Sequence, residues 1–325
     1  MTKWFQSGFL PIAALLLATF GVSACDTGPE EADRSEVSAT TKANDATAKK
    51  SATSTPSGPP RPAMWKLSDS DTHIFLFGGV HMLPKGIDWQ SGWIDTVVDS
   101  ADMLILELAP EEQAQAPQVL AELTVEGSEV PMDERIPPQL TDELDILAGR
   151  ARVSRAQLDG MESWAAALTL SNAVSRNASL SIKNGTEAIL TKRFQDLGKP
   201  VSGLETAQFQ LSLFDQLPQR TQDELLTRTI EQAGDASTKF DQLISAWSKG
   251  DVEAVGRYAD AELRDVEGLS LPLLEQRNAA WAKWINDRMQ QPGTVLIAVG
   301  AGHLVGDDSV QTMLQGMGYK IERVQ

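Results

Sequence analysis

Cysteine is nearly absent from this sequence, because Cys25 is the only one in 325 residues. No intramolecular disulfide can therefore form, and the core alone has to stabilise the fold. Basic residues are also scarce: 28 Lys and Arg stand against 45 Asp and Glu, which gives a formal net charge of −17 at pH 7. Nucleic-acid binding, or direct adsorption to anionic lipid, requires a concentrated basic face. We therefore expect no nucleic-acid partner.

The N-terminal residues have the order of an export signal. Lys3 precedes the apolar residues 9–20, a run too short to span a bilayer comfortably, and small residues follow at 21–24. We expect residues 1–24 to be a signal peptide. Val22-Ser23-Ala24-Cys25 resembles the lipobox of bacterial lipoproteins, so the expected product is acylated on Cys25, with palmitate among its acyl chains. The alternative is an ordinary signal peptide that ends near a cysteine.

The lipobox resemblance implies a cell-envelope protein that is anchored to a membrane through lipid on Cys25. Its globular part would be extracytoplasmic, and periplasmic in a Gram-negative cell. Residues 25–62 contain no aromatic residue and only Val37 among the larger aliphatic ones. Such a segment cannot bury enough apolar surface to offset its ordering entropy. We expect a disordered tether over residues 25–62 and one domain over residues 63–325, a length that can bury a sizeable core.

Strand and helix patterns alternate at both ends of this domain, and the pattern between them is helical. A helix is predicted at residues 89–101, and helical spacing of apolar residues recurs over 111–194 and 208–289. Apolar runs predict strands at residues 64–67, 73–80, 103–108, 199–206, 294–299 and 319–324. The predicted fold class is α/β: a mixed, largely parallel sheet covered by helices, with a long helical cap region.

Two of the three histidines follow an apolar run in the phrase Gly-x-x-His. His81 follows Gly78, and His303 follows Gly300. A glycine before each histidine permits a tight turn and close approach of the backbone. Either histidine alone would be read as a core or loop residue, but the repeated phrase favours one shared site.

Two glutamates end neighbouring strand patterns in the same way. Glu107 and Glu205 each lie at the end of an apolar run, and the carboxyl ends of parallel strands meet at one edge of a sheet. Two imidazoles and one or two carboxylates are suitable ligands for Mn²⁺, Co²⁺ or Zn²⁺ with a water position left open. The alternative for each glutamate is a solvated or capping carboxylate.

The helical pattern near the C-terminus carries two polar residues of interest. Asn278 interrupts an otherwise apolar stripe, and Arg277 borders it. Since a buried polar group needs a partner, this pair could orient a glutamate or hold an oxyanion. The alternative is that Arg277 extends to solvent while Asn278 bonds to nearby backbone.

Taken together, these segments resemble the TraB/GumN family, whose eukaryotic relatives include the Tiki membrane metalloproteases. The matching segments occur in the family's order and are Phe77-Gly78-Gly79-Val80-His81, Leu104-Ile105-Leu106-Glu107, Gly203-Leu204-Glu205-Thr206, Glu275-Gln276-Arg277-Asn278, Val299-Gly300-Ala301-Gly302-His303-Leu304-Val305-Gly306 and Gly318-Tyr319. The resemblance implies a mixed α/β fold like that of erythromycin esterases. It also implies catalytic or metal-binding roles for His81, Glu107 and His303, with Glu205, Arg277 and Asn278 in support.

We expect a membrane-anchored, extracytoplasmic, metal-dependent hydrolase. Peptide bonds are one class of bond that it could cleave. A divalent ion would polarise the scissile carbonyl and acidify its bound water, while a carboxylate or histidine moves the proton. Two alternatives stay open. One is a metal-independent hydrolase that resembles erythromycin esterases and uses a histidine base, and the other is a lipoprotein that binds a metal or haem without catalysis. The sequence leaves open whether the substrate is a peptide or a small molecule.

Overall fold

The computed structural model describes residues 59–90, 92–177, 180–259, 263 and 266–325. The expectations for the signal peptide, for Cys25 and for nearly all of the tether lie outside these residues. Contacts with the domain begin slightly before the predicted boundary at residue 63, because the Arg61 amide donates a 2.7 Å hydrogen bond to the Ser248 carbonyl.

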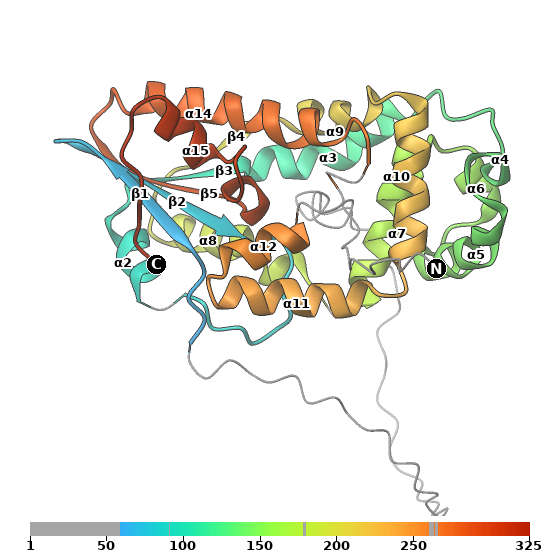
Figure 1. Cartoon of the computed structure of the whole chain (residues 1–325), viewed down its shortest axis with the longest axis horizontal. Helices are drawn as coiled ribbons and strands as arrows, with labels where there is room; N and C mark the ends of the chain where they lie inside the picture. The colour runs from blue at the N-terminus through green and yellow to red at the C-terminus, as the bar shows by residue number, and fades with distance from the viewer. Residues whose placement is uncertain (1–58, 91, 178–179, 260–262, 264–265) are drawn as a thin grey trace, which may run out of the picture.

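Six strands form one mixed sheet in the order β4-β3-β5-β2-β1-β6 (Figure 1). The strands are β1 (Met64–Ser68), β2 (Thr72–Gly79), β3 (Met103–Leu108), β4 (Val201–Glu205), β5 (Gly293–Gly300) and β6 (Glu322–Arg323). β2, β5, β3 and β4 run parallel to one another, whereas β1 is antiparallel to β2 and to β6. The predicted α/β class with a mixed, largely parallel sheet is confirmed.

The three central strands are buried on both faces because their apolar residues alternate between two core clusters. Phe77, Leu106 and Ala298 belong to one cluster, and Leu76 and Ile297 belong to the other. This period of two is that of a pleated strand. Figure 1 shows α14 and α15 covering one face of the sheet and α8, α11 and α12 lying on the other.

Helices fill the sequence between the strands and form a helical region beside the sheet, at the right of Figure 1. Those before β4 are α2 (Trp93–Ser100), α3 (Pro110–Leu123), α4 (Met132–Arg135), α5 (Thr141–Ala151), α6 (Arg155–Asp159), α7 (Ser163–Asn177) and α8 (Thr186–Asp196), with short 3-10 turns η2 (Pro138–Leu140) and η3 (Ile182–Asn184). Those after β4 are α9 (Ala207–Asp215), α10 (Gln219–Gln232), α11 (Ala236–Ser248), α12 (Val252–Ala259), the π-helical turn η4 (Leu271–Glu275), α14 (Gln276–Arg288), the 3-10 turn η5 (Ala301–Leu304) and α15 (Val310–Gly316). In the described part of the chain, every helix is too short or too polar to cross a membrane.

Most predicted boundaries differ from the structure by one or two residues, and two differ by more. The helix expected from residue 89 begins at Trp93, because Gly92 precedes it with a φ of +74°, outside the helical region. Trp89 instead stacks on Phe77 in the core, with ring centroids 5.5 Å apart. The last strand, expected over residues 319–324, is limited to β6, because the chain leaves α15 through a turn with Gly318 at a φ of +97° and pairs with β1 only at Glu322 and Arg323.

Candidate functional site

The four polar residues that were predicted to follow strands meet at the carboxyl-terminal edge of the sheet. Glu107 lies near the end of β3 and Glu205 ends β4, while His81 follows β2 and His303 lies in η5, directly after β5. Parallel pairing sets this arrangement, because Gly79 and Gly300 are partners in the β2–β5 register. All four side chains are almost inaccessible to solvent. The structure therefore places all four residues close together at one edge of the sheet, as predicted.

Glu107 lies between the two histidines. Its Oε1 atom is 3.9 Å from His81 Nε2 and 4.0 Å from His303 Nε2. The same oxygen accepts a 2.8 Å hydrogen bond from the Gly300 amide. A methyl group on Gly300 would lie 3.0 Å from His81 Nε2 and 3.2 Å from Glu107 Oε1. The glycine of the second motif thus has a steric reason: it leaves room for the imidazole and the carboxylate to approach.

Arg277 joins the two glutamates. Its Nη2 donates to Glu107 Oε2 at 2.6 Å and to Glu205 Oε2 at 2.8 Å, and its Nε donates to Glu205 Oε1 at 3.0 Å. Its Nη1 donates to the Leu273 carbonyl, which lies within η4. The alternative that Arg277 extends to solvent was wrong, because the helix directs this side chain into the sheet edge, where it is 2% exposed.

The guanidinium sets the charge of the nearby carboxylate. Burial alone would raise the pKa of Glu107, but Arg277 and the two histidines hold that pKa well below its usual range. Burial opposes the charge of Arg277 too, and Glu107 and Glu205 raise its pKa. Glu107 is therefore ionised, and both glutamates contact one permanent cation.

The hydrogen bonds of His303 fix its tautomer. Asn278 donates through Nδ2 to the Asp308 carbonyl at 2.8 Å, so its Oδ1 is the atom that faces His303 Nδ1 at 2.6 Å. His303 Nδ1 therefore carries the hydrogen, and Nε2 accepts from Arg277 Nη1 at 3.2 Å. Burial and then the positive charge of Arg277 lower the pKa of His303 to about 3. This imidazole is neutral at physiological pH.

The side chain of Asn278 is fully buried, as its place in the apolar stripe predicted. Its bond to the Asp308 carbonyl matches one half of the alternative, in which Asn278 binds backbone. Its second bond, to His303, makes it a positioning residue as well. Trp281, three residues after Asn278 on the same stripe, donates to Glu205 Oε1 at 2.8 Å and packs against the His303 ring.

Glu187 is a further member of this site that was not predicted from the sequence. Its Oε1 lies 3.0 Å from His81 Nδ1, a distance at which the two form an ion pair, although their geometry is not that of a hydrogen bond. Burial would lower the pKa of His81, but Glu187 and then Glu107 outweigh it and raise this pKa to about 9. Gln210, also unpredicted, donates to Glu205 and Glu107.

Glycines and a threonine bring Glu187 to His81. The amide of Val80 donates to Thr186 Oγ1 at 3.0 Å, which ties the loop after β2 to the start of α8. A methyl group on Gly79 would lie 2.7 Å from Glu187 Oε1, and one on Gly185 would lie 1.9 Å from the His81 carbonyl oxygen. Glu187 lies within the helical pattern that was predicted over residues 111–194. Gly185, two positions before it, is the one feature of the sequence that distinguishes this glutamate from the other polar residues of that pattern.

The donor atoms do not fit a bound divalent ion as they are arranged. Both oxygens of Glu107 and both ring nitrogens of His303 are hydrogen-bonded to protein groups, and the Arg277 cation is 2.6 Å from Glu107. Each ring nitrogen of His303 has a single site, which its hydrogen bond uses, and the guanidinium already lies beside Glu107 where a cation would bind. Over the described residues, no group of three or more His, Cys, Asp or Glu side chains is suited to hold a metal. The ion stays a prediction.

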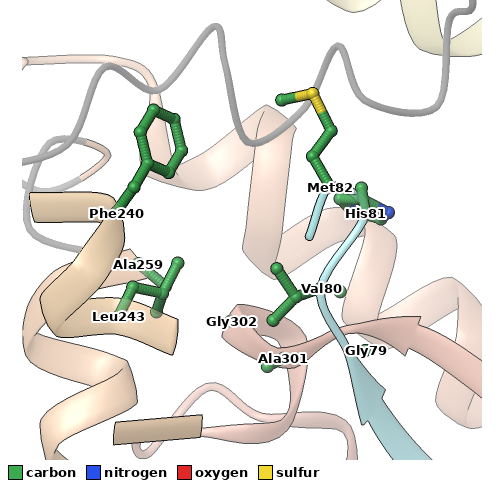
Figure 2. A pocket seen from close by; sticks show the side chains of 10 residues that line it. Gly79, Val80, His81, Met82, Phe240, Leu243, Ala259, Ala301 and Gly302 are labelled. Atoms are coloured by element: carbon green, nitrogen blue, oxygen red, sulfur yellow. The ribbon is translucent and has the colours of Figure 1, made fainter. Parts of the chain in front are cut away.

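A small pocket opens beside His81 (Figure 2). Its free volume is about 20 Å³, and its lining consists of Gly79, Val80, His81, Met82, Phe240, Leu243, Ala259, Gly300, Ala301 and Gly302. Glu107 and His303 do not line it. Of the residues clustered at the sheet edge, His81 is the titratable one that borders this pocket.

Comparison with known proteins identifies the family of this chain. Residues 63–323 match the model of the TraB/PrgY/gumN family, and the match begins at the predicted start of the domain. YbaP of Escherichia coli K12, described as an uncharacterized protein, is 26% identical over 245 residues, which cover 75% of this chain and 88% of YbaP. The Shigella flexneri YbaP shows the same identity and coverage. No solved structure matches the chain significantly. The chain belongs to the TraB/PrgY/gumN family.

Proposed function

We propose that this protein is a hydrolase of ester or amide bonds in which His81 activates the attacking water. One observation carries the proposal: His81 borders the pocket and is flanked by two carboxylates, Glu187 at 3.0 Å from Nδ1 and Glu107 at 3.9 Å from Nε2. A base whose second nitrogen is oriented by a carboxylate is the common arrangement of histidine-dependent hydrolysis.

In this mechanism Glu187 keeps the hydrogen of neutral His81 on Nδ1, which leaves the lone pair of Nε2 available. A water between Nε2 and Glu107 Oε1 could bond to both atoms, because their 3.9 Å separation exceeds a direct hydrogen bond. The water oxygen forms a bond to the substrate carbonyl carbon, and its proton passes to Nε2. The bond to the leaving group then breaks, and the leaving group takes that proton from His81. The two carboxylates stabilise the imidazolium that exists between these steps.

The remaining residues act through these groups. Arg277 and Gln210 bind Glu107 and hold its carboxylate in place, and Glu205 binds Arg277 in turn. His303 is neutral and buried, so in this proposal it positions Arg277 rather than transferring the proton. A metal-dependent variant has one observation in its favour: His81 Nε2 and His303 Nε2 both lie within 4.0 Å of Glu107 Oε1. An ion there would require Arg277 to move.

The test is a screen of 4-nitrophenyl esters and short peptides with the wild type and His81→Gln. We expect His81→Gln to lower kcat/KM by about a hundredfold or more, the usual scale for losing a positioned base. His73→Gln is the matched control, because His73 lies at the opposite end of β2 and makes no contact with the cluster. Its activity should stay close to that of the wild type.

The outcomes separate the alternatives. Activity that disappears on exhaustive chelation and returns with Mn²⁺, Co²⁺ or Zn²⁺ would replace the protein-only mechanism with the metal-dependent one. Absence of turnover on every substrate, together with a tightly retained metal or haem, would favour a binding protein. Equal activity in wild type and His81→Gln would reject the assignment of the base.

We also propose that the domain is anchored in the cell envelope through lipid on Cys25. The support is Val22-Ser23-Ala24-Cys25 after an export-type apolar run. Cys25→Ala should abolish incorporation of labelled palmitate, whereas Ser23→Ala, which keeps the cysteine, should retain it. Labelling of Cys25→Ala would show that the acylation site lies elsewhere or that the lipobox reading is wrong.

A further inference from the structure

The pocket beside His81 has two walls of different origin. Phe240 and Leu243 of α11 and Ala259 of α12 lie on one side of Figure 2, and Val80 and Met82 of the loop after β2 lie on the other. The turn of Gly300 to Gly302 contributes the floor. Elements that are more than 150 residues apart in sequence therefore meet around this space.

The chemistry of this lining is apolar except at His81. Phe240, Leu243 and Val80 are all buried, with at most 8% of each residue exposed. The free volume of about 20 Å³ is small, since a cavity must offer roughly 10–15 Å³ before it admits one water. An apolar group of about one or two carbon atoms would fit without rearrangement of these side chains.

The proposed base nitrogen lies close to one residue that lines the pocket. A methyl group on Gly300 would lie 3.0 Å from His81 Nε2, and Gly300 also lines the pocket. A bond attacked by water at Nε2 is therefore separated from the apolar pocket by little more than this glycine. The part of the substrate next to that bond is the part that the pocket contacts.

We propose that the substrates are esters or amides that carry a short apolar group next to the scissile bond, and that Phe240 and Leu243 limit the length of this group. The inference rests on the proposed hydrolytic function. It adds a substrate class and two specificity-determining residues. Burial of each methylene of such a group contributes to binding until the group meets α11, after which longer chains clash.

The catalytic test uses two series of esters on the full chain. One varies the acyl group of 4-nitrophenyl esters from acetate through butyrate to octanoate, and the other varies the alcohol of alkyl acetates over the same lengths. In at least one series we expect kcat/KM to fall by about tenfold or more between the four-carbon and eight-carbon members.

Two variants assign the length limit to α11. Leu243→Phe should fill the pocket and lower kcat/KM for the four-carbon ester about tenfold, mainly through a higher KM. Phe240→Leu should open the pocket and raise activity on the eight-carbon ester. Ile244→Phe is the matched control, because Ile244 is also buried in α11 but does not line the pocket. It introduces the same side chain one residue away and should leave the length preference unchanged.

A binding measurement separates failure of this inference from failure of the proposed function. Saturation-transfer NMR with butyrate and with 1-butanol should show contact of the alkyl protons with the wild type, and Leu243→Phe should weaken it. Binding of this kind without any hydrolysis would reject the hydrolase and keep the apolar pocket. Hydrolysis that is indifferent to chain length and to both α11 variants would reject the pocket and keep the hydrolase. If the protein hydrolyses none of the esters and neither butyrate nor 1-butanol contacts it, the inference is also overturned.

Discussion

Replacement of Arg277 by methionine should destabilise the protein strongly. Arg277 is 2% exposed and donates to Glu107 and to Glu205. Methionine fills much of the same volume but leaves two buried carboxylates without their cation. Glu107 would keep bonds from Gly300 and Gln210, and Glu205 would keep bonds from Trp281 and Gln210. Loss of one partner from a buried ion pair costs about 3–5 kcal/mol, and we expect Arg277→Met to fall in that range.

The assay is urea unfolding followed by tryptophan fluorescence and circular dichroism. Arg193→Met is the matched control, because Arg193 forms an ion pair with Asp95 at 2.7 Å in which the Asp95 side chain is 50% exposed. Such a pair contributes about 0–1 kcal/mol. Adding Glu205→Gln to Arg277→Met should restore part of the loss, because it removes one uncompensated charge. If Arg277→Met costs no more than Arg193→Met, the charge cluster does not have the energetic role described here.

Three further predictions concern the same cluster. Gly300→Ala should lower activity by about tenfold or more, because its methyl group would crowd His81 Nε2 and Glu107 Oε1, and steady-state kinetics with a melting curve would check this. Glu107→Gln should cut hydrolysis about a hundredfold while a folded protein is retained, and unchanged kinetics would contradict its role. The free energy of unfolding should fall by up to about 4 kcal/mol as pH drops from 6.5 towards 3, because the unfolded chain protonates His303 while the folded chain, with its pKa near 3, does not. His303→Gln should remove that part of the pH dependence in denaturation series at several pH values.

The sequence predicted the sheet well because its central strands are buried on both faces. Such strands appear as continuous apolar runs, and the predicted strand at residues 103–108 has the same bounds as β3. Boundaries were less accurate where a glycine decided them, as at Gly92 before α2. The order of the strands within the sheet depends on long-range pairing, which local patterns do not specify.

The site was predictable where a residue follows a strand or, as for Arg277 and Asn278, lies on or beside an apolar helical stripe, and it was not predictable at two other helical positions. His81, Glu107 and His303 share the strand-end position, so topology alone brings them together. Glu187 and Gln210 lie in helices among many other polar residues, and only tertiary packing directs them towards the strand ends. The charge states were also not readable from sequence. The two histidines have the same local phrase, yet Glu187 raises the pKa of His81 against burial, whereas burial and then Arg277 lower that of His303.

The dependence of kcat/KM on pH, measured for the wild type and for Glu187→Gln, tests the central claim most directly. Against burial, Glu187 raises the pKa of His81 to about 9, so activity that needs the unprotonated imidazole should rise with pH and reach half of its maximum near pH 9. Removing the charge of Glu187 lowers that pKa, so Glu187→Gln should move the midpoint to lower pH and reduce the maximum. A midpoint that is the same in both proteins, or activity that falls as pH rises through 9, would contradict a His81 base oriented by Glu187.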